Sequence, residues 1–246
     1  MKRILIVGAT SAIAHACARQ WAGAGHALYL VARDNERLTS NAADLVGRGA
    51  GRVETFNLDV QNIEEQKAMV QQCWTAFHQI DIALIAHGTL PDQAVCEVQA
   101  DTAFHEFNVN ATCTIALLGL LANRFEQQRC GTLAVISSVA GERGRPTNYL
   151  YGAAKAAVST FAEGLRSRMY KLGVHVLTIK PGFVNTPMTQ GLALPQALVA
   201  QPDAVASAIL KAIDTRKDVI YTPAFWSLIM LVIRTIPGFI FKRLNL

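Results

Sequence analysis

The sequence has 246 residues, of which 51% are hydrophobic, and a formal net charge of +5. This length can bury the core of one α/β domain, and no linker or repeat interrupts the chain. The positive charge is not gathered in a basic run, so we expect no nucleic-acid partner. It could equally meet an anionic cofactor, a phosphorylated substrate or a membrane surface.

The cysteines give no sign of a disulfide framework or of a metal site. The five of them stand singly, at positions 17, 73, 96, 113 and 130, without CxxC spacing. No cluster of histidine, cysteine and carboxylate residues has metal-ligand spacing, so we expect no bound metal. A strand-like segment begins at residue 2, where a signal peptide would stand, and this favours a cytoplasmic protein.

The chain opens with a pattern typical of a dinucleotide-binding fold. Residues 2–7 (KRILIV) are expected to form a buried strand that turns at Gly8 into a helix. Gly8 permits the tight turn, and the helix amino end offers free N–H groups and a positive dipole to a pyrophosphate. Hydroxyl donors or a helix cap come from Thr10 and Ser11. The candidate cofactor contacts here are Gly8, Thr10, Ser11, Ala12 and Ile13.

Strands and helices then alternate to the end of the chain. Further strands are predicted at 27–31, 52–57, 82–86, 132–137, 175–179 and 219–222, and helices at 37–46, 64–77, 101–123, 151–172 and 203–215. Seven strands joined by six crossover helices predict an α/β fold: a Rossmann-type, doubly wound, parallel seven-stranded sheet in a single domain.

Three polar residues in the second half of the chain are suited to the reduction of a carbonyl group. Tyr151 and Lys155 are four residues apart on a predicted helix, so they share one face. An ammonium there would stabilise a phenolate and let the tyrosine exchange its proton near neutral pH. Ser138 follows a predicted strand, so its hydroxyl should emerge where open α/β sheets bind ligands. The alternative is a chance YxxxK helix and a serine that only forms a turn.

These motifs resemble those of the short-chain dehydrogenase/reductase family over essentially the whole chain. The resemblance implies that Tyr151 is the general acid, that Lys155 lowers its pKa and binds the nicotinamide ribose, and that Ser138 donates to the substrate carbonyl. Asn110, in the NVN segment, matches the asparagine that holds a proton-relay water, with Asn108 as its rival. The segment PGFVNT resembles the loop beside the nicotinamide carboxamide, which adds Pro181, Gly182, Val184 and Thr186.

The sequence departs from the family pattern in two motifs. The usual TGxxxGxG turn has Ala12 and Ala14 in place of its later glycines, which puts close approach to the cofactor in question. The usual NNAG motif is replaced by residues 85–88 (IAHG), and Ala86 and Gly88 are kept as cofactor contacts. His87 is interpreted as a structural hydrogen-bonding residue rather than a catalytic one.

The end of the second strand favours NADP(H). Ala32 stands where an acid would accept from the ribose 2′-OH, and the guanidinium of Arg33, which follows, is suited to a phosphate. Arg33 could instead be a solvated surface charge, and Asp34 is expected to cap the next helix. Asp59 and Val60 resemble the pair that contacts adenine in the family. NAD(H) remains the alternative cofactor.

Residues 223–246 are interpreted as an apolar, basic-tipped extension of the domain formed by residues 1–222. The apolar stretch is too short to span a bilayer, and Arg234 interrupts it. One hypothesis is peripheral contact with the inner face of the membrane, with Trp226 at the headgroup level and Lys242 and Arg243 facing anionic lipid. The alternatives are packing on the same subunit, packing on a partner subunit, or a wall of the substrate pocket.

This extension, together with the HGTL segment and residues 181–188 and 221–223, narrows the resemblance to the reductases of decaprenylphosphoryl-2-keto-ribose. It implies a ketone substrate in the form of a keto-sugar on a polyprenyl phosphate, made by an upstream oxidase in an epimerisation pathway. Apolar residues in the segment 186–202, where the family keeps its substrate lid, suit such a substrate: Met188, Leu192 and Leu194.

Two other functions stay open. One is a reductase of a 3-oxoacyl or steroid-like ketone, and the other is a cofactor-binding scaffold without turnover, motivated by the substituted glycines. The family resemblance further implies a homodimer or homotetramer that pairs through the helices at 101–123 and 151–172.

Overall fold

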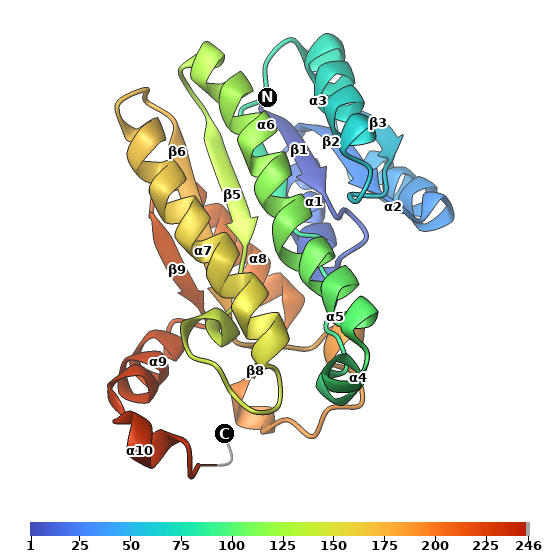
Figure 1. Cartoon of the computed structure of the whole chain (residues 1–246). Helices are drawn as coiled ribbons and strands as arrows, with labels where there is room; N and C mark the ends of the chain where they lie inside the picture. The colour runs from blue at the N-terminus through green and yellow to red at the C-terminus, as the bar shows by residue number, and fades with distance from the viewer. Residues whose placement is uncertain (245–246) are drawn as a thin grey trace.

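The computed structural model, which describes residues 1–244, contains a seven-stranded sheet between two layers of helices (Figure 1). The strands are β1 (Arg3–Val7), β2 (Ala27–Ala32), β3 (Arg52–Asn57), β4 (Ile82–Ile85), β5 (Thr132–Ile136), β6 (His175–Pro181) and β9 (Val219–Thr222). Their order is β3-β2-β1-β4-β5-β6-β9, and every neighbouring pair is parallel. The predicted Rossmann-type doubly wound sheet is confirmed.

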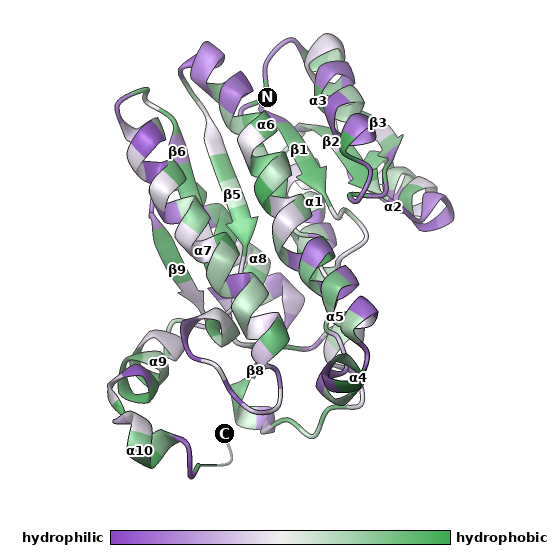
Figure 2. Ribbon diagram, viewed as in Figure 1, coloured by the Kyte–Doolittle hydropathy of each residue, from purple (hydrophilic) through white to green (hydrophobic). Residues whose placement is uncertain are grey.

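Helices cover both faces of the sheet. One layer holds α1 (Ala12–Gly23), α2 (Asn35–Gly47) and α8 (Pro202–Asp214), and the other holds α3 (Ile63–Phe77), α6 (Cys113–Gln128) and α7 (Tyr149–Tyr170). Each layer buries its own apolar cluster against the sheet. The strands are largely hydrophobic and the outer helix faces are hydrophilic (Figure 2). Near-continuous apolar strands such as β1 and β2 are expected where both sheet faces are covered.

The register of the sheet brings the loops that follow the strands to one edge. Val7 of β1 pairs with Val31 of β2 and with Ile85 of β4, and Ile85 pairs with Val135 of β5. These strands therefore end at the same level. The loops after β1, β2, β4 and β5 consequently meet at their carboxyl ends, where such sheets bind ligands.

The prediction of one continuous helix at 101–123 is wrong. The chain forms α4 (Gln93–Val98) and α5 (Ala100–Phe107), then a π-helical turn at Asn108–Thr112, and only then α6. The π turn holds Asn110, whose side-chain amide donates to the carbonyl of Glu106 (3.0 Å) and to Thr89 Oγ1 (2.8 Å). Single π turns inside helices are frequent at functional sites.

The segments after β5 and β6 add small elements to the carboxyl edge. They are η2 (Val139–Glu142) after β5, β7 (Phe183–Val184), η3 (Pro187–Thr189), η4 (Gln196–Leu198) and β8 (Val199–Ala200). The two-residue strands β7 and β8 pair with each other in parallel. This pairing ties the two ends of the segment predicted as the substrate lid to each other.

The C-terminal extension forms α9 (Trp226–Thr235) and α10 (Gly238–Phe241), which lie beyond the end of β9 (Figure 1). Trp226 is only 2% exposed, and it packs with Met230 and Val139. The placement of Trp226 at a membrane headgroup level is therefore wrong, because this face of α9 is buried on the same subunit. The last two residues of the extension lie outside the described residues. Between residues 1 and 244, no helix is long and apolar enough to cross a membrane.

Candidate active site

One cavity of about 670 Å³ lies at the carboxyl edge and gathers nearly all of the predicted site residues. Its wall contains Gly8, Thr10, Ser11, Ala12, Ile13, Arg33, Asp59, Val60, Ala86, Gly88, Ser138, Tyr151, Lys155, Pro181, Gly182, Val184 and Thr186. Asn110 is the exception: it does not line the cavity, although its neighbour Val109 does. Residues far apart in the sequence therefore meet in one place.

The turn after β1 has the geometry that a dinucleotide phosphate needs. Gly8 has a φ of +85°, and a Cβ there would lie 2.4 Å from the backbone nitrogen of His87, so only glycine fits. Ser11 stands at the N-cap of α1, but its side chain makes no capping hydrogen bond. Ala12 and Ala14 belong to α1 itself, so neither alanine needs a strained backbone. The residues present thus fit a pyrophosphate at this helix end.

The loop after β2 carries two arginines rather than one. Arg33 and Arg37 both line the cavity, and Arg37 Nη2 donates to the carbonyl of Thr10 (2.9 Å). Asp34 accepts from the Arg37 backbone (3.0 Å), so its predicted role as a helix cap is confirmed. Arg37 was missed, although a basic residue in the first turn of the helix after the second strand could have indicated it.

The loop after β3 presents Asp59 beside Val60 at the cavity wall. The Asp59 carboxylate accepts from the backbone of Gln61 (3.0 Å), while Asn62 caps α3. Asp59 therefore shapes the turn and does not cap the helix.

The catalytic candidates of β5 and α7 lie together. Lys155 is 3% exposed, and its Nζ donates to the carbonyl of Ile136 (3.2 Å) and lies 5.6 Å from the centre of the Tyr151 ring. Ser138 caps η2 by accepting from the backbone of Ala140 (3.1 Å). Ser137, which the sequence analysis did not single out, donates to the carbonyl of Lys155 (2.9 Å). That bond fixes α7 against the end of β5.

The expected lowering of the Tyr151 pKa is not found. Burial raises the pKa of Tyr151 to about 12, and the nearby Ser138 hydroxyl offsets this only in part. Burial also lowers the pKa of Lys155 to about 8. The ammonium lies over the tyrosine ring and is directed at a main-chain carbonyl, so the chain by itself keeps Tyr151 protonated.

Asn110 and His87 brace the loop after β4. The Asn110 side chain bonds with both the backbone and the hydroxyl of Thr89, which in turn contacts Glu106. His87 Nε2 bonds with the Thr114 hydroxyl (2.9 Å), as a structural histidine would. Within residues 1–244 its buried Nδ1 has no hydrogen-bond partner, and burial lowers its pKa to about 3.

The far end of the cavity includes the predicted lid residues Met188 and Leu192, and two residues that no motif indicated, Arg145 and Asn148. The residues of this end come from the loop after β4, from the loop between η2 and α7, and from the segment after β7: Thr89, Leu90, Arg145, Asn148, Phe183, Met188 and Leu192. Leu194 does not reach the cavity wall. The described part of the chain contains no group of three or more potential metal-ligating side chains.

A phosphate-binding turn, an arginine pair and a buried lysine beside a tyrosine define a dinucleotide-dependent oxidoreductase. The family model for short chain dehydrogenases matches residues 2–197, so the chain belongs to the short-chain dehydrogenase family. It is an NAD(P)-dependent oxidoreductase with the fold of that family.

Relatives cover nearly the full chain. An uncharacterized oxidoreductase of Mycobacterium tuberculosis is 35% identical over 98% of this chain and 96% of its own length. An uncharacterized oxidoreductase of Streptomyces coelicolor is 33% identical over 99% of this chain and 96% of its own length. The crystal structure of 3-oxoacyl-[acyl-carrier protein] reductase from Brucella melitensis superposes with a TM-score of 0.79 at 23% identity, covering 89% of each chain. This last likeness concerns the fold alone.

Proposed function

We propose that the protein is an NADPH-dependent ketoreductase whose proton donor is Tyr151. The observation that carries this proposal is that Ser138, Tyr151 and Lys155 line the same cavity as the phosphate-binding turn and Arg33. A bound nicotinamide supplies the hydride for the carbonyl carbon. The residues of this chain then have to orient the ketone and protonate its oxygen.

Each of the catalytic residues has a definite task in that scheme. With its pKa near 12, Tyr151 holds its proton at physiological pH and can give it to the ketone oxygen. Ser138 donates a hydrogen bond to the same oxygen and polarises the carbonyl. Lys155, held by the Ile136 carbonyl, places positive charge beside Tyr151 as the phenolate forms. Asn110 is assigned to the relay that restores the proton.

NADP(H) is the proposed cofactor because Arg33 and Arg37 line the cavity. In addition, Ala32 stands at the end of β2, where a carboxylate would repel the 2′-phosphate. The test is a titration of NADPH and NADH, followed by quenching of intrinsic tryptophan fluorescence. We expect tighter binding of NADPH and a preference that Arg33→Ala removes. Equal binding of both cofactors would refute the preference. Binding of neither would favour a scaffold without turnover.

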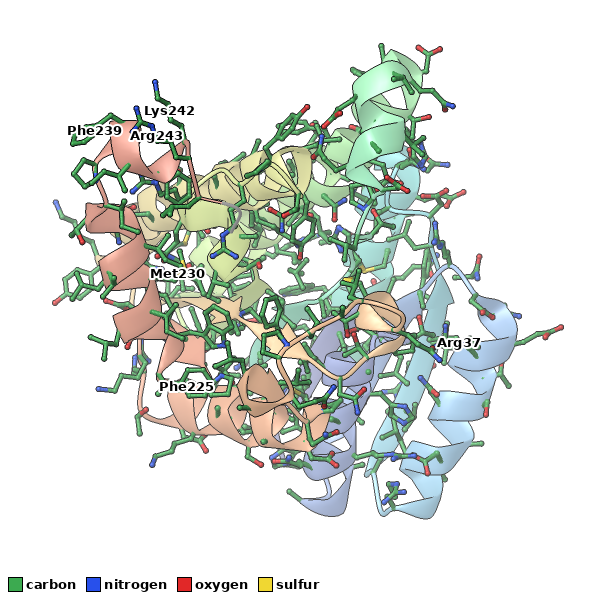
Figure 3. All side chains as sticks on the ribbon, turned by 90° about the horizontal axis from the view of Figure 1, so that it is seen from below. Arg37, Phe225, Met230, Phe239, Lys242 and Arg243 are labelled. Atoms are coloured by element: carbon green, nitrogen blue, oxygen red, sulfur yellow. The ribbon has the colours of Figure 1, made fainter. Side chains whose placement is uncertain are left out.

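The proposed substrate is a keto-sugar on a polyprenyl phosphate, delivered at the inner face of the membrane by an upstream oxidase. The support comes from the outer face of the C-terminal extension, where Leu228 and Phe239 are each 65% exposed. Phe239, Lys242 and Arg243 project away from the body of the molecule (Figure 3). Such an apolar face with a basic tip suits a peripheral contact with anionic lipid.

The second candidate is a reductase of a 3-oxoacyl or steroid-like ketone. Met188 and Leu192 in the cavity wall support it, because they would contact the apolar part of such a ketone as well as they would contact a polyprenyl chain. Turnover with a panel of lipid-linked keto-sugars, 3-oxoacyl thioesters and steroid ketones separates the two candidates.

A homodimer or homotetramer through α6 and α7 is proposed from the family alone, and light scattering tests it.

A further inference from the structure

Two arginines in the loop between η2 and α7 have opposite surroundings. Arg143 donates through Nη1 to the carbonyls of Ile233 (2.6 Å), Arg234 (3.1 Å) and Ile236 (2.7 Å), and its guanidinium lies 3.8 Å from the centre of the Phe241 ring. It holds the carboxyl end of α9. This arginine is a structural tie.

Arg145, two residues later, lacks such partners. Its Nη2 contacts only the sulfur of Met230 (3.5 Å), a weak acceptor, and its buried Nε has no hydrogen-bond partner. No carboxylate of residues 1–244 forms an ion pair with it. Burial lowers the pKa of its guanidinium. A partly buried cation without an anion costs stability, and such a cost is typical of a ligand site.

Arg145 lies in the wall of the catalytic cavity, at its far end. It shares that wall with Ser138, Tyr151 and Asn148. The backbone N–H of Asn148 donates to the carbonyl of Arg145 (3.2 Å), so the two residues belong to one turn. The side-chain oxygen of Asn148 is buried without a partner among the described residues. It can accept a hydrogen bond from a hydroxyl group.

This position differs from the one proposed for the cofactor 2′-phosphate. Arg145 contacts Met230 of α9, and Figure 3 places Met230 and Arg37 on opposite sides of the molecule. An anion held by Arg145 therefore belongs to the substrate end of the cavity.

We propose that Arg145 binds an anionic group of the ketone substrate, of the phosphodiester type, while Asn148 accepts from a substrate hydroxyl. The inference rests on the proposed ketoreductase function and names the substrate class within it: a hydroxylated ketone with a negative charge. A neutral steroid would leave both polar groups without partners. The same guanidinium chemistry would serve a carboxylate, so the test separates the two anions.

The first experiment measures binding to the complex with NADP⁺, using phosphorus NMR and two probes of the same shape. Dimethyl phosphate carries the negative charge of a phosphodiester, and trimethyl phosphate is neutral. We expect only the anion to bind, and Arg145→Met to weaken it roughly 10- to 100-fold, as for a lost hydrogen bond to a charged group. Acetate, competing with dimethyl phosphate, shows whether a carboxylate binds equally well.

Arg143→Met is the matched control. It should lower the melting temperature, because Arg143 holds the end of α9. It should leave dimethyl phosphate binding within about twofold, because Arg143 does not line the cavity. Arg145→Met should keep or raise the melting temperature, since it removes an unpaired charge. NADPH affinity should stay unchanged in Arg145→Met.

Equal binding of the two phosphates by the wild-type protein would overturn the proposal, as would full dimethyl phosphate affinity in Arg145→Met. A melting temperature that falls as far as in Arg143→Met would assign Arg145 to structure. The binding measurement does not depend on turnover. If dimethyl phosphate binds through Arg145 but no ketone is reduced, the anion site stands and the proposed reductase function fails.

Discussion

Gly182 and Trp226 form a contact that ties the C-terminal extension to the loop after β6. A Cβ built on Gly182 would lie 1.9 Å from Nε1 and 2.0 Å from Cε2 of the Trp226 indole. The ring is rigid and packs edge-on against Phe183, with 5.1 Å between ring centres, so it cannot yield locally. We expect Gly182→Ala to displace Trp226 from its buried site.

The size of the effect follows from what the displaced ring loses. Removing a buried tryptophan side chain costs about 3–5 kcal/mol, and overpacking that is partly relieved costs about 1–3 kcal/mol. Gly182→Ala should therefore lower the free energy of unfolding by about 2–4 kcal/mol. Trp226→Ala should cost about as much as any buried tryptophan. The double variant should cost no more than Trp226→Ala alone, because the added methyl then has space.

The assay is urea unfolding followed by circular dichroism, combined with NADPH titration. Gly47→Ala is the matched control, because Gly47 is exposed at the end of α2 and a Cβ there meets nothing within 4 Å. It should change the stability by less than about 1 kcal/mol. Additive costs of Gly182→Ala and Trp226→Ala would refute the reasoning, since residues in contact must show coupling. So would a Gly182→Ala variant as stable as Gly47→Ala.

Three further predictions concern the catalytic cavity. Tyr151→Phe should reduce turnover by about 10²–10⁴-fold and retain NADPH affinity. Turnover is followed by the loss of NADPH absorbance, and full turnover in this variant would contradict the role of Tyr151 as the acid. The kcat/KM for ketone reduction should fall as the pH rises through about 8, because Lys155 then loses its charge; a flat profile to pH 10 would remove Lys155 from the scheme. Because the pKa of His87 is lowered from 6.5 to about 3, the unfolded chain binds more protons between these values. The free energy of unfolding should consequently fall on acidification through this window, by at most about 1.4 kcal/mol per pH unit, and less steeply in His87→Gln.

The sheet could be predicted from the sequence because each strand is a short apolar run between turn residues, and because parallel crossovers have one handedness. The positions of Ser138, Tyr151 and Lys155 followed from local spacing along one strand end and one helix. Such local patterns survive folding unchanged. The continuity of the helix at 101–123 did not, because the π turn holds Asn110, whose side chain bonds with Thr89, a residue distant in the sequence.

Charge and burial were harder to predict than position. The pKa of Tyr151 depends on how deeply the cavity buries it, and spacing from Lys155 gives no measure of that. Trp226 was placed at a membrane surface because its neighbours in the sequence are apolar, yet in the fold it is buried against Val139, Met230 and the backbone of Gly182. Arg145 belongs to no motif, and it is distinguished from Arg143 only in the folded chain, by its place in the cavity wall and its lack of partners among the described residues.

The extension after β9 does not line the cavity, but it packs against residues that do. Three contacts join it to the site: Trp226 covers Gly182, Met230 supports Arg145, and Arg143 holds the end of α9. The family model ends at residue 197, so these contacts lie largely outside the part that is common to short chain dehydrogenases. The shared part supplies the cofactor turn and the Ser-Tyr-Lys set, which are suited to many ketones. Under the proposed function, selection among ketones would fall to residues that the extension contacts, and Arg145 is the one among them whose charge has no ion-pair partner within residues 1–244.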